Sequence, residues 1–411
     1  MKKSFLLALS VSLLLLSSCN NSESLLQEGR WRATLETKSG NEIPFNFDVK
    51  KDSVSGEPII EIINGDERLR VDDVSVKNDS IAIIMPFFDS EFKAAFEGDQ
   101  IKGLWVKHLA YKDVVMPFSA EPDQDFRFFK AGTKTSFNAT GRWAVNFFSA
   151  EDSSQAVGEF VQSESKLVGT FLTTTGDYRY LEGTIAGNNL FLSCFDGSHA
   201  YLFTGKIDSN TIVNGKFYSG AGGVEQWSAV RNPAAQLPDA YSLTKLKQGL
   251  KRLDFAYPDL NKQIVSSKDE RFKNKVVIVQ LLGSWCPNCM DETRFMSAFY
   301  KENHTRGFEV VGLAFERTTD FDRSKKNVAN IQKRFEVGYP LLITDKTSDK
   351  KQRDAALPAL DRIMGFPTTI IIDKKGQVRK IHTGFSGPGT GKHYTDFVKE
   401  FTQTINELLA E

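Results

Sequence analysis

Short runs of alternating apolar and polar residues fill the chain from residue 24 to residue 232. Gly, Asn and Asp separate these runs, and no long segment has the 3.6-residue period of an amphipathic helix. Alternation of period two places successive side chains on opposite faces of a strand, so this region is predicted to be all β. The clearest strands are IPFNFDV (43–49), SIAIIMPFF (80–88), NLFLSCF (189–195) and AYLFTGKI (200–207).

The β region contains an internal repeat, which begins with the sequence Gly-Arg-Trp at Gly29 and again at Gly141. We expect two barrel-like or sandwich-like units, at 19–125 and 136–232, or two halves of one larger barrel. The matched aromatic residues favour core positions, and no catalytic or metal-binding cluster is evident, so we interpret the region as a binding or spacing module. The further matches are Phe88-Asp89 with Phe195-Asp196, Gly98 with Gly205, Gly103–Trp105 with Gly215–Phe217, and Phe118 with Trp227.

From about residue 250 the pattern changes to strands that alternate with amphipathic helices, which predicts a central sheet covered by helices on both faces. Residues 251–411 are the predicted α/β domain. A Pro- and Ala-rich linker at 233–250 precedes it, with a short basic helix predicted at 243–253. The predicted strands are 275–283, 308–315, 339–344, 368–373 and 377–385, and the predicted helices are 287–303, 323–336 and 393–411.

The N-terminus has the features of an export signal, with Lys2 and Lys3 before the apolar run Phe5–Leu16. The residues Leu16-Ser17-Ser18-Cys19 match a bacterial lipobox, so we expect cleavage after residue 18 and lipid on Cys19. The alternative is an ordinary signal peptide with Cys19 incidental. The prediction is a lipoprotein of the bacterial cell envelope that faces the periplasm. Asn20, in place of an aspartate, favours the outer over the inner membrane.

Composition narrows the possible functions. The chain has 411 residues, 40% of them apolar, and a net charge of zero, which is typical of a soluble multidomain protein and leaves no electrostatic basis for binding nucleic acid. Of the four cysteines, Cys194 lies in an apolar strand and is expected to be a buried thiol. Only Cys286 and Cys289 remain as an internal pair, so the chain is not a disulfide-stapled scaffold.

Cys286 falls where a strand ends, and Cys289 falls in the first turn of the next helix, after Pro287. A helix N-terminus favours the thiolate, so Cys286 is the expected nucleophile and Cys289 the resolving thiol. A zinc site would need further ligands, and the histidines are scattered, so no metal is expected. An inert disulfide closing so short a loop would add little stability. The spacing therefore favours redox exchange.

Several motifs in order resemble the TlpA/ResA-type branch of thioredoxin-like thiol–disulfide oxidoreductases. They are FAYPDLNKQ (255–263), KVVIVQLLGSWCPNC (275–289), GFPTTIIID (365–373) and HTGF (382–385), and the resemblance covers about 253–411. It implies a thioredoxin-like fold, with Cys286 and Cys289 as the redox pair and Pro367 as a cis-proline facing them. The other site residues it implies are Trp285 and Glu292 near the pair, with Glu292 as a proton relay, and Phe366, Thr368 and Gly384 as substrate-binding positions.

The chain departs from the family pattern in three places. The acid often found six residues before the first cysteine is Gln280, so acid–base help must come from Glu292, Glu316 or water. The residues LLGSW (281–285) replace the aromatic pair that usually precedes the first cysteine. The segment 343–364, before the cis-proline, is expected to include the extra helix that this branch inserts. The double β region has no counterpart in the simplest members, so substrate choice cannot be inherited from them.

These features predict an envelope-anchored thiol–disulfide oxidoreductase that acts as a protein-disulfide reductase and needs no cofactor. Its expected partners are disulfide-containing proteins and a membrane electron donor. An oxidant or a peroxiredoxin-like enzyme is an alternative, although a peroxiredoxin would normally have a lone peroxidatic cysteine. A ligand- or peptide-binding lipoprotein with the α/β domain as a scaffold is another.

Overall fold

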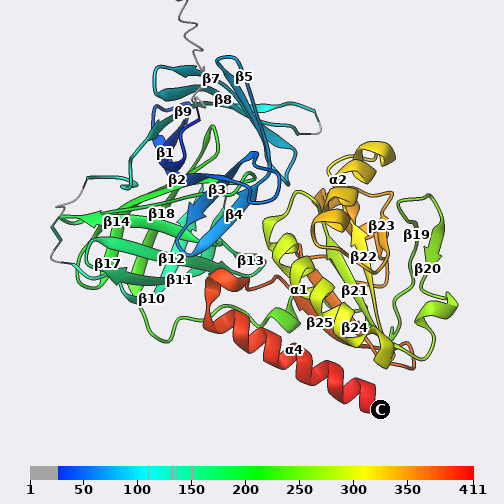
Figure 1. The fold of residues 1–411 in the computed structure, drawn as a ribbon. Helices are drawn as coiled ribbons and strands as arrows, with labels where there is room; N and C mark the ends of the chain where they lie inside the picture. The colour runs from blue at the N-terminus through cyan, green and yellow to red at the C-terminus, as the bar shows by residue number, and fades with distance from the viewer. Residues whose placement is uncertain (1–25, 110, 131–133, 136, 150–151) are drawn as a thin grey trace, which may run out of the picture.

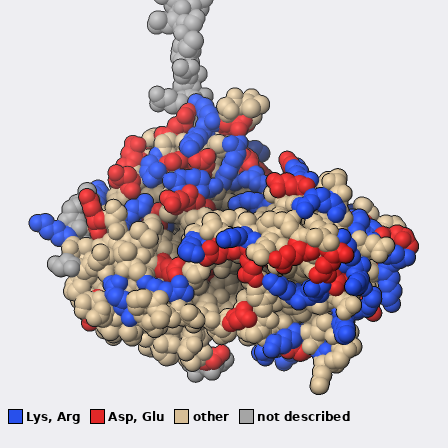
Figure 2. All heavy atoms as spheres, turned by 90° about the horizontal axis from the view of Figure 1, so that it is seen from below, with Lys and Arg blue, Asp and Glu red and all other residues tan. Residues whose placement is uncertain are grey.

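The computed structural model describes residues 26–109, 111–130, 134–135, 137–149 and 152–411. A β region and an α/β domain lie side by side, and the last helix runs beneath both (Figure 1). The predicted signal peptide and Cys19 lie outside the described residues. Within the described part, no helix is long and apolar enough to cross a membrane. Acidic and basic side chains are interspersed over the face in Figure 2, in keeping with the zero net charge.

The first nine strands form one antiparallel sheet in the order β4-β3-β2-β1-β9-β8-β7-β6-β5. Strand alternation puts Trp31, Phe45 and Trp105 in its core with almost no exposed surface. The strands are β1 Gly29–Glu36, β2 Glu42–Lys51, β3 Pro58–Asn64, β4 Glu67–Val71, β5 Asp73–Lys77, β6 Ser80–Ile84, β7 Ser90–Glu97, β8 Gln100–Lys107 and β9 Val114–Pro122.

The second sheet has the order β11-β10-β18-β17-β16-β15-β14-β12-β13, and β11 also pairs with β12, which closes it into a barrel. Closure removes the unpaired strand edges. The strands are β10 Gly141–Phe148, β11 Ser153–Ser163, β12 Lys166–Thr173, β13 Gly176–Asp177, β14 Leu181–Ala186, β15 Asn189–Phe195, β16 Ala200–Ile207, β17 Thr211–Ser219 and β18 Gly223–Arg231.

The two sheets confirm the repeat. The neighbour order β1-β9-β8-β7 of the first recurs as β10-β18-β17-β16 in the second. The indole N–H of Trp31 donates to the carbonyl of Gln27 at 3.0 Å, and that of Trp143 donates to Ala139 at 2.9 Å. The region is therefore two units, and not two halves of one barrel. They pack on each other through a shared core, where the rings of Phe45 and Phe195 lie 4.5 Å apart.

The α/β domain has a five-stranded sheet in the order β23-β22-β21-β24-β25, in which β24 alone runs antiparallel to the other strands. Val276 and Ile278 of β21 pack with α1 and α4 on one face, and Val277 and Val279 pack with residues of α2 and α3 on the other. The elements are β19 Ala256–Pro258, β20 Ile264–Ser266, β21 Val276–Leu282, α1 Pro287–Asn303, β22 Phe308–Ala314, α2 Phe321–Arg334, β23 Leu341–Ile343, α3 Lys350–Ala356, β24 Thr368–Ile372, β25 Val378–Thr383 and α4 Lys392–Ala410.

The prediction of a helix at 243–253 was wrong. This segment is irregular and lies along the α/β domain, where Leu246 forms an isolated bridge with Leu360. The backbone N–H groups of Lys245 and Lys247 donate to Asp361 and to the Ala359 carbonyl, both at 2.9 Å. Pairing with the neighbouring chain replaces the intrahelical hydrogen bonds, because tertiary contacts override a weak local helix propensity.

Candidate active site

The two cysteines of the pair are joined by a disulfide, with their Cα atoms 5.2 Å apart. Cys286 is the N-cap residue of α1, and its sulfur accepts the backbone N–H of Cys289 at 3.2 Å. That N–H and the positive end of the helix favour negative charge on Cys286 once the pair is reduced. Cys286 retains 6% of its surface exposed, whereas Cys289 has none, so Cys286 is the sulfur that a substrate can reach.

The loop before β24 faces the pair. Its Phe366–Pro367 peptide bond is cis, and the Phe366 carbonyl oxygen lies 3.7 Å from the Cys286 sulfur. Gly384 has φ +82°, which favours glycine, and its N–H donates to the Pro367 carbonyl at 2.8 Å. Trp285 lies edge-on to the Phe366 ring at 5.7 Å. Thr368 begins β24 and is fully buried.

Glu292 is fully buried in α1, one turn after Cys289. The side-chain amide of Gln280 donates to one of its oxygens at 2.8 Å, and the Thr369 hydroxyl donates to the other. Burial raises the pKa of Glu292 to about 7, although both hydrogen bonds act to lower it. The site therefore holds a carboxyl group that can take up or release a proton near neutral pH.

Comparison with known proteins matches residues 247–396 to the Redoxin family. The ResA thiol–disulfide oxidoreductase of Bacillus thuringiensis subsp. konkukian (strain 97-27) is 27% identical over 158 residues, which are 38% of this chain and 80% of that protein. The thioredoxin-like protein YneN of Bacillus subtilis (strain 168) is 30% identical over 139 residues, which are 34% of this chain and 73% of that protein. This chain belongs to the thioredoxin-like thiol–disulfide oxidoreductases.

A thioredoxin-family thiol:disulfide interchange protein from Chlorobium tepidum TLS is a structural neighbour, with 24% identity and a TM-score of 0.30. The match covers 40% of this chain and 98% of that one.

This oxidoreductase has a second buried carboxyl near the pair, that of Glu316. It accepts the backbone N–H of Ser284 at 2.8 Å and the Ser284 hydroxyl at 2.6 Å, and burial raises its pKa. Because Ser284 lies two residues before Cys286, Glu316 holds the loop that leads into the active site. Among the described residues, no group of three or more His, Cys, Asp or Glu side chains could hold a metal ion.

The β region docks directly on the active-site helix through Arg179, which lies between β13 and β14 and is almost fully buried. Its guanidinium donates to Asp291 of α1 and to the Pro287 carbonyl, the latter at 3.2 Å. It also pairs with Glu67 of β4 and lies 3.5 Å from Asp196, so one side chain joins both β units to α1. A buried charge needs partners of this kind.

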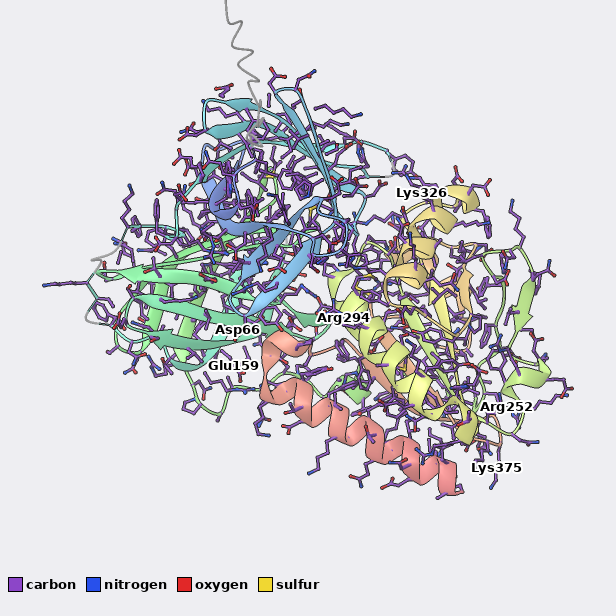
Figure 3. All side chains as sticks on the ribbon, in the orientation of Figure 1. Asp66, Glu159, Arg252, Arg294, Lys326 and Lys375 are labelled. Atoms are coloured by element: carbon purple, nitrogen blue, oxygen red, sulfur yellow. A yellow bond between two sulfur atoms is a disulfide. The ribbon has the colours of Figure 1, made fainter. Side chains whose placement is uncertain are left out.

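Further contacts hold the same interface. The side-chain amide of Asn288, between the two cysteines, donates to the Asp177 carbonyl at 3.2 Å. At the other end of the interface, His393 of α4 lies 3.0 Å from Glu159 of β11. Glu159 and the α1 residue Arg294 both lie along this junction in Figure 3. The active-site helix is thus packed between the β region and its own sheet.

The turn between β12 and β13 lies against the cis-proline loop. A Cβ atom added at Gly365 would lie 2.5 Å from Thr175, and one at Gly384 would lie 2.9 Å from the Thr175 carbonyl carbon. Both glycines therefore allow the turn to approach closely. What remains open beside Cys286 is a cleft of about 840 Å³, walled by both β units and the thioredoxin-like domain.

The structure places Phe366 beside Cys286 and Trp285 against Phe366, with Gly384 bonded to Pro367 in the facing loop. Glu292 follows Cys289 by one turn of α1, and Thr368 begins β24 directly after Pro367. Sequence reasoning missed Arg179, Asp291, Asn288 and the Thr175 turn. Arg179 and Asp291 are 112 residues apart in the chain, and neither belongs to a recognisable motif, so no local pattern could have found their contact. Gln280 was noted as a missing acid, but its role in holding Glu292 depends on the fold.

Proposed function

We propose that this oxidoreductase is a disulfide reductase, in which the Cys286 thiolate attacks a substrate disulfide and Cys289 resolves the mixed disulfide. The observation that carries the proposal is the position of Cys286, because it caps α1, accepts the Cys289 N–H and is the more exposed sulfur of the pair. These features favour the reduced, thiolate form of Cys286. A membrane electron donor would restore the dithiol.

The remaining roles are part of the same proposal. Phe366 and Pro367 offer their backbone groups to a substrate bound beside Cys286, and Trp285 packs edge-on against the Phe366 ring. Thr368 and Gly384 support the loop that meets the substrate. Glu292 exchanges the proton of Cys289, in keeping with its burial three residues further along α1.

The equilibrium reduction potential of the pair tests the direction. It is measured in glutathione or dithiothreitol buffers on the chain from residue 20 onward, which keeps every described residue. We expect a value at or below about −250 mV, close to that of thioredoxin. A value near about −120 mV would make the enzyme an oxidant. With no reversible couple, the α/β domain would be a scaffold and the protein a binding lipoprotein.

We also propose that lipid on Cys19 holds the enzyme in the bacterial envelope, with the outer membrane favoured. The support is the lipobox Leu16–Cys19 behind an apolar run. Membrane fractionation of the wild type and of Cys19→Ala tests this anchor, and equal release of both from the membrane would refute it.

A further inference from the structure

The cleft beside Cys286 carries unpaired positive charge. Its two acidic groups already have partners: Asp113 lies 3.1 Å from His108, and Asp177 accepts the Gly387 N–H at 2.8 Å. The cations that line the cleft have no carboxylate at ion-pair distance within the described part of the chain. These cations are Lys38, Lys107, Lys112 and Arg317.

Lys107 is the most enclosed of these cations. Its ammonium donates to the carbonyl oxygen and hydroxyl of Ser198, at 2.7 and 2.9 Å, which leaves one of its three N–H groups for a ligand. The Ser198 hydroxyl in turn donates to the carbonyl of Trp285 at 3.4 Å, next to Cys286. Burial, with a smaller effect from the charge of Arg317, lowers the pKa of Lys107 to about 8, so it stays mostly charged at pH 7.

A second unpaired donor lines the same cleft. Trp105 is 1% exposed, and its indole N–H has no hydrogen-bond partner among the described residues. An indole can only donate, so it needs an acceptor. Arg317, which also lines the cleft, adds further N–H donors. Its guanidinium lies 4.9 Å from the centre of the Trp285 ring. The unused groups of the cleft are therefore donors and cations, which suit a carboxylate.

The size of the cleft restricts what can enter. At about 840 Å³ it falls within the range of small-molecule sites. The Thr175 turn fills the side next to Gly365 and Gly384, where a long polypeptide would otherwise lie along the cis-proline loop. Tyr178 and Tyr201 add aromatic surface to the walls of the cleft, which suits an apolar portion of a ligand.

We propose that this cleft binds a low-molecular-weight disulfide that carries carboxylate groups, and that the Cys286–Cys289 dithiol reduces it there. The inference rests on the proposed redox function and names its substrate class. The Cys286 thiolate forms a disulfide with one substrate sulfur, and the other leaves as a thiolate and takes a proton. Cys289 loses its proton and attacks Cys286, which releases the second thiol. Two electrons pass from the dithiol to the substrate, and a thiol reductant restores the pair.

Single-turnover oxidation of the pre-reduced protein tests the substrate class without depending on the electron donor. The probes are 3,3′-dithiodipropionate, a dianion, bis(2-hydroxyethyl) disulfide, which is neutral, and cystamine, a dication. Thiol alkylation and mass spectrometry follow the loss of the dithiol. Each rate constant is divided by that of dithiothreitol with the same disulfide, which cancels differences between the leaving thiols. We expect the normalised rate to be about tenfold higher for the dianion than for the neutral probe, and lower for the dication.

Matched variants locate the effect. Lys107→Gln and Arg317→Gln should each reduce the preference for the dianion severalfold, and Lys107→Arg should retain it. Lys102→Gln is the control, because Lys102 lies on the same strand but pairs with Glu97 on the surface. Equal normalised rates for the three probes would overturn the substrate class and leave the redox function intact. No oxidation by any probe, the neutral one included, would refute the redox function and this inference with it.

Discussion

Glu292 is a carboxyl group in the middle of the thioredoxin-like domain, and it has no charged partner among the described residues. In the part of the chain that the structure describes, Gln280 and Thr369 are the side chains that hydrogen-bond to it. Since burial raises its pKa to about 7, both protonation states are populated at neutral pH. A general base and acid is most effective under this condition. Its position one turn after Cys289 fits the resolving step, in which that thiol must lose a proton.

Replacing Glu292 with Gln keeps the shape but removes the proton exchange. We expect Glu292→Gln to slow the resolving step about a hundredfold, so that mixed disulfide accumulates. The rate–pH profile should lose its inflection near pH 7. Quenched-flow trapping of the mixed disulfide between pH 5 and pH 9 measures both effects. The control is Glu302→Gln, an exposed position on the same helix. An unchanged profile would exclude Glu292 from the proton exchange.

Stability gives a second readout of the same substitution. The folded protein holds the Glu292 proton up to about pH 7, whereas the ordinary pKa of this group is 4.5. The free energy of unfolding should therefore fall as the pH rises from about 4.5 to about 7, because only the unfolded chain releases this proton readily. In Glu292→Gln, urea unfolding at several pH values should show less of this decline.

At the scale of elements, the link between β13 and β14 determines how the β region meets α1. Arg179 compensates the buried carboxylates Asp196 and Asp291 and the partly buried Glu67. Removing one partner from a buried charge network leaves the others uncompensated, which costs more than the loss of an exposed ion pair. The interface is therefore more sensitive to this residue than to its other polar contacts.

We expect Arg179→Leu to lower the free energy of unfolding by about 3 to 5 kcal/mol, measured by urea denaturation. It should also change the rate of oxidation of the pair, because Arg179 binds the Pro287 carbonyl between the two cysteines. The control is Arg334→Leu, which removes an exposed bridge from α2 to Asp72 of the β region and should cost about 1 kcal/mol or less. Equal losses in the two variants would refute a central role for Arg179.

The elements themselves were largely predictable because their patterns are local. Helix α1 begins at Pro287 as expected, and β21 is apolar at every position except Gln280 because the sheet is covered on both faces. The segment 243–253 was predicted as a short basic helix, yet its backbone hydrogen-bonds to residues more than 100 positions away. Such pairing leaves no local trace in the sequence.

At the scale of the whole molecule, the site could be predicted only in part. Cys286, Cys289 and Pro367 lie in motifs, so their place was evident from the chain alone. The cleft could not be predicted from the chain alone, because its walls come from three parts of the sequence. Lys107, for example, hydrogen-bonds to Ser198, which is 91 residues further along the chain. The β units, which looked like a separate module, form most of the enclosure around the reactive sulfur.

This enclosure predicts what the β region does to substrate range. Residues 239–411 keep the segment that packs along the thioredoxin-like domain but lose the Thr175 turn and Lys107. We expect this shorter chain to reduce insulin several times faster than the longer one, since a folded protein can now reach Cys286, and to lose the preference for anionic disulfides. Insulin turbidity with dithiothreitol measures the first effect, and circular dichroism confirms folding. If the longer chain reduced insulin equally fast, the β region would not restrict access. A folded but inactive short chain would instead mean that docking of the β region is needed to keep α1 competent for exchange.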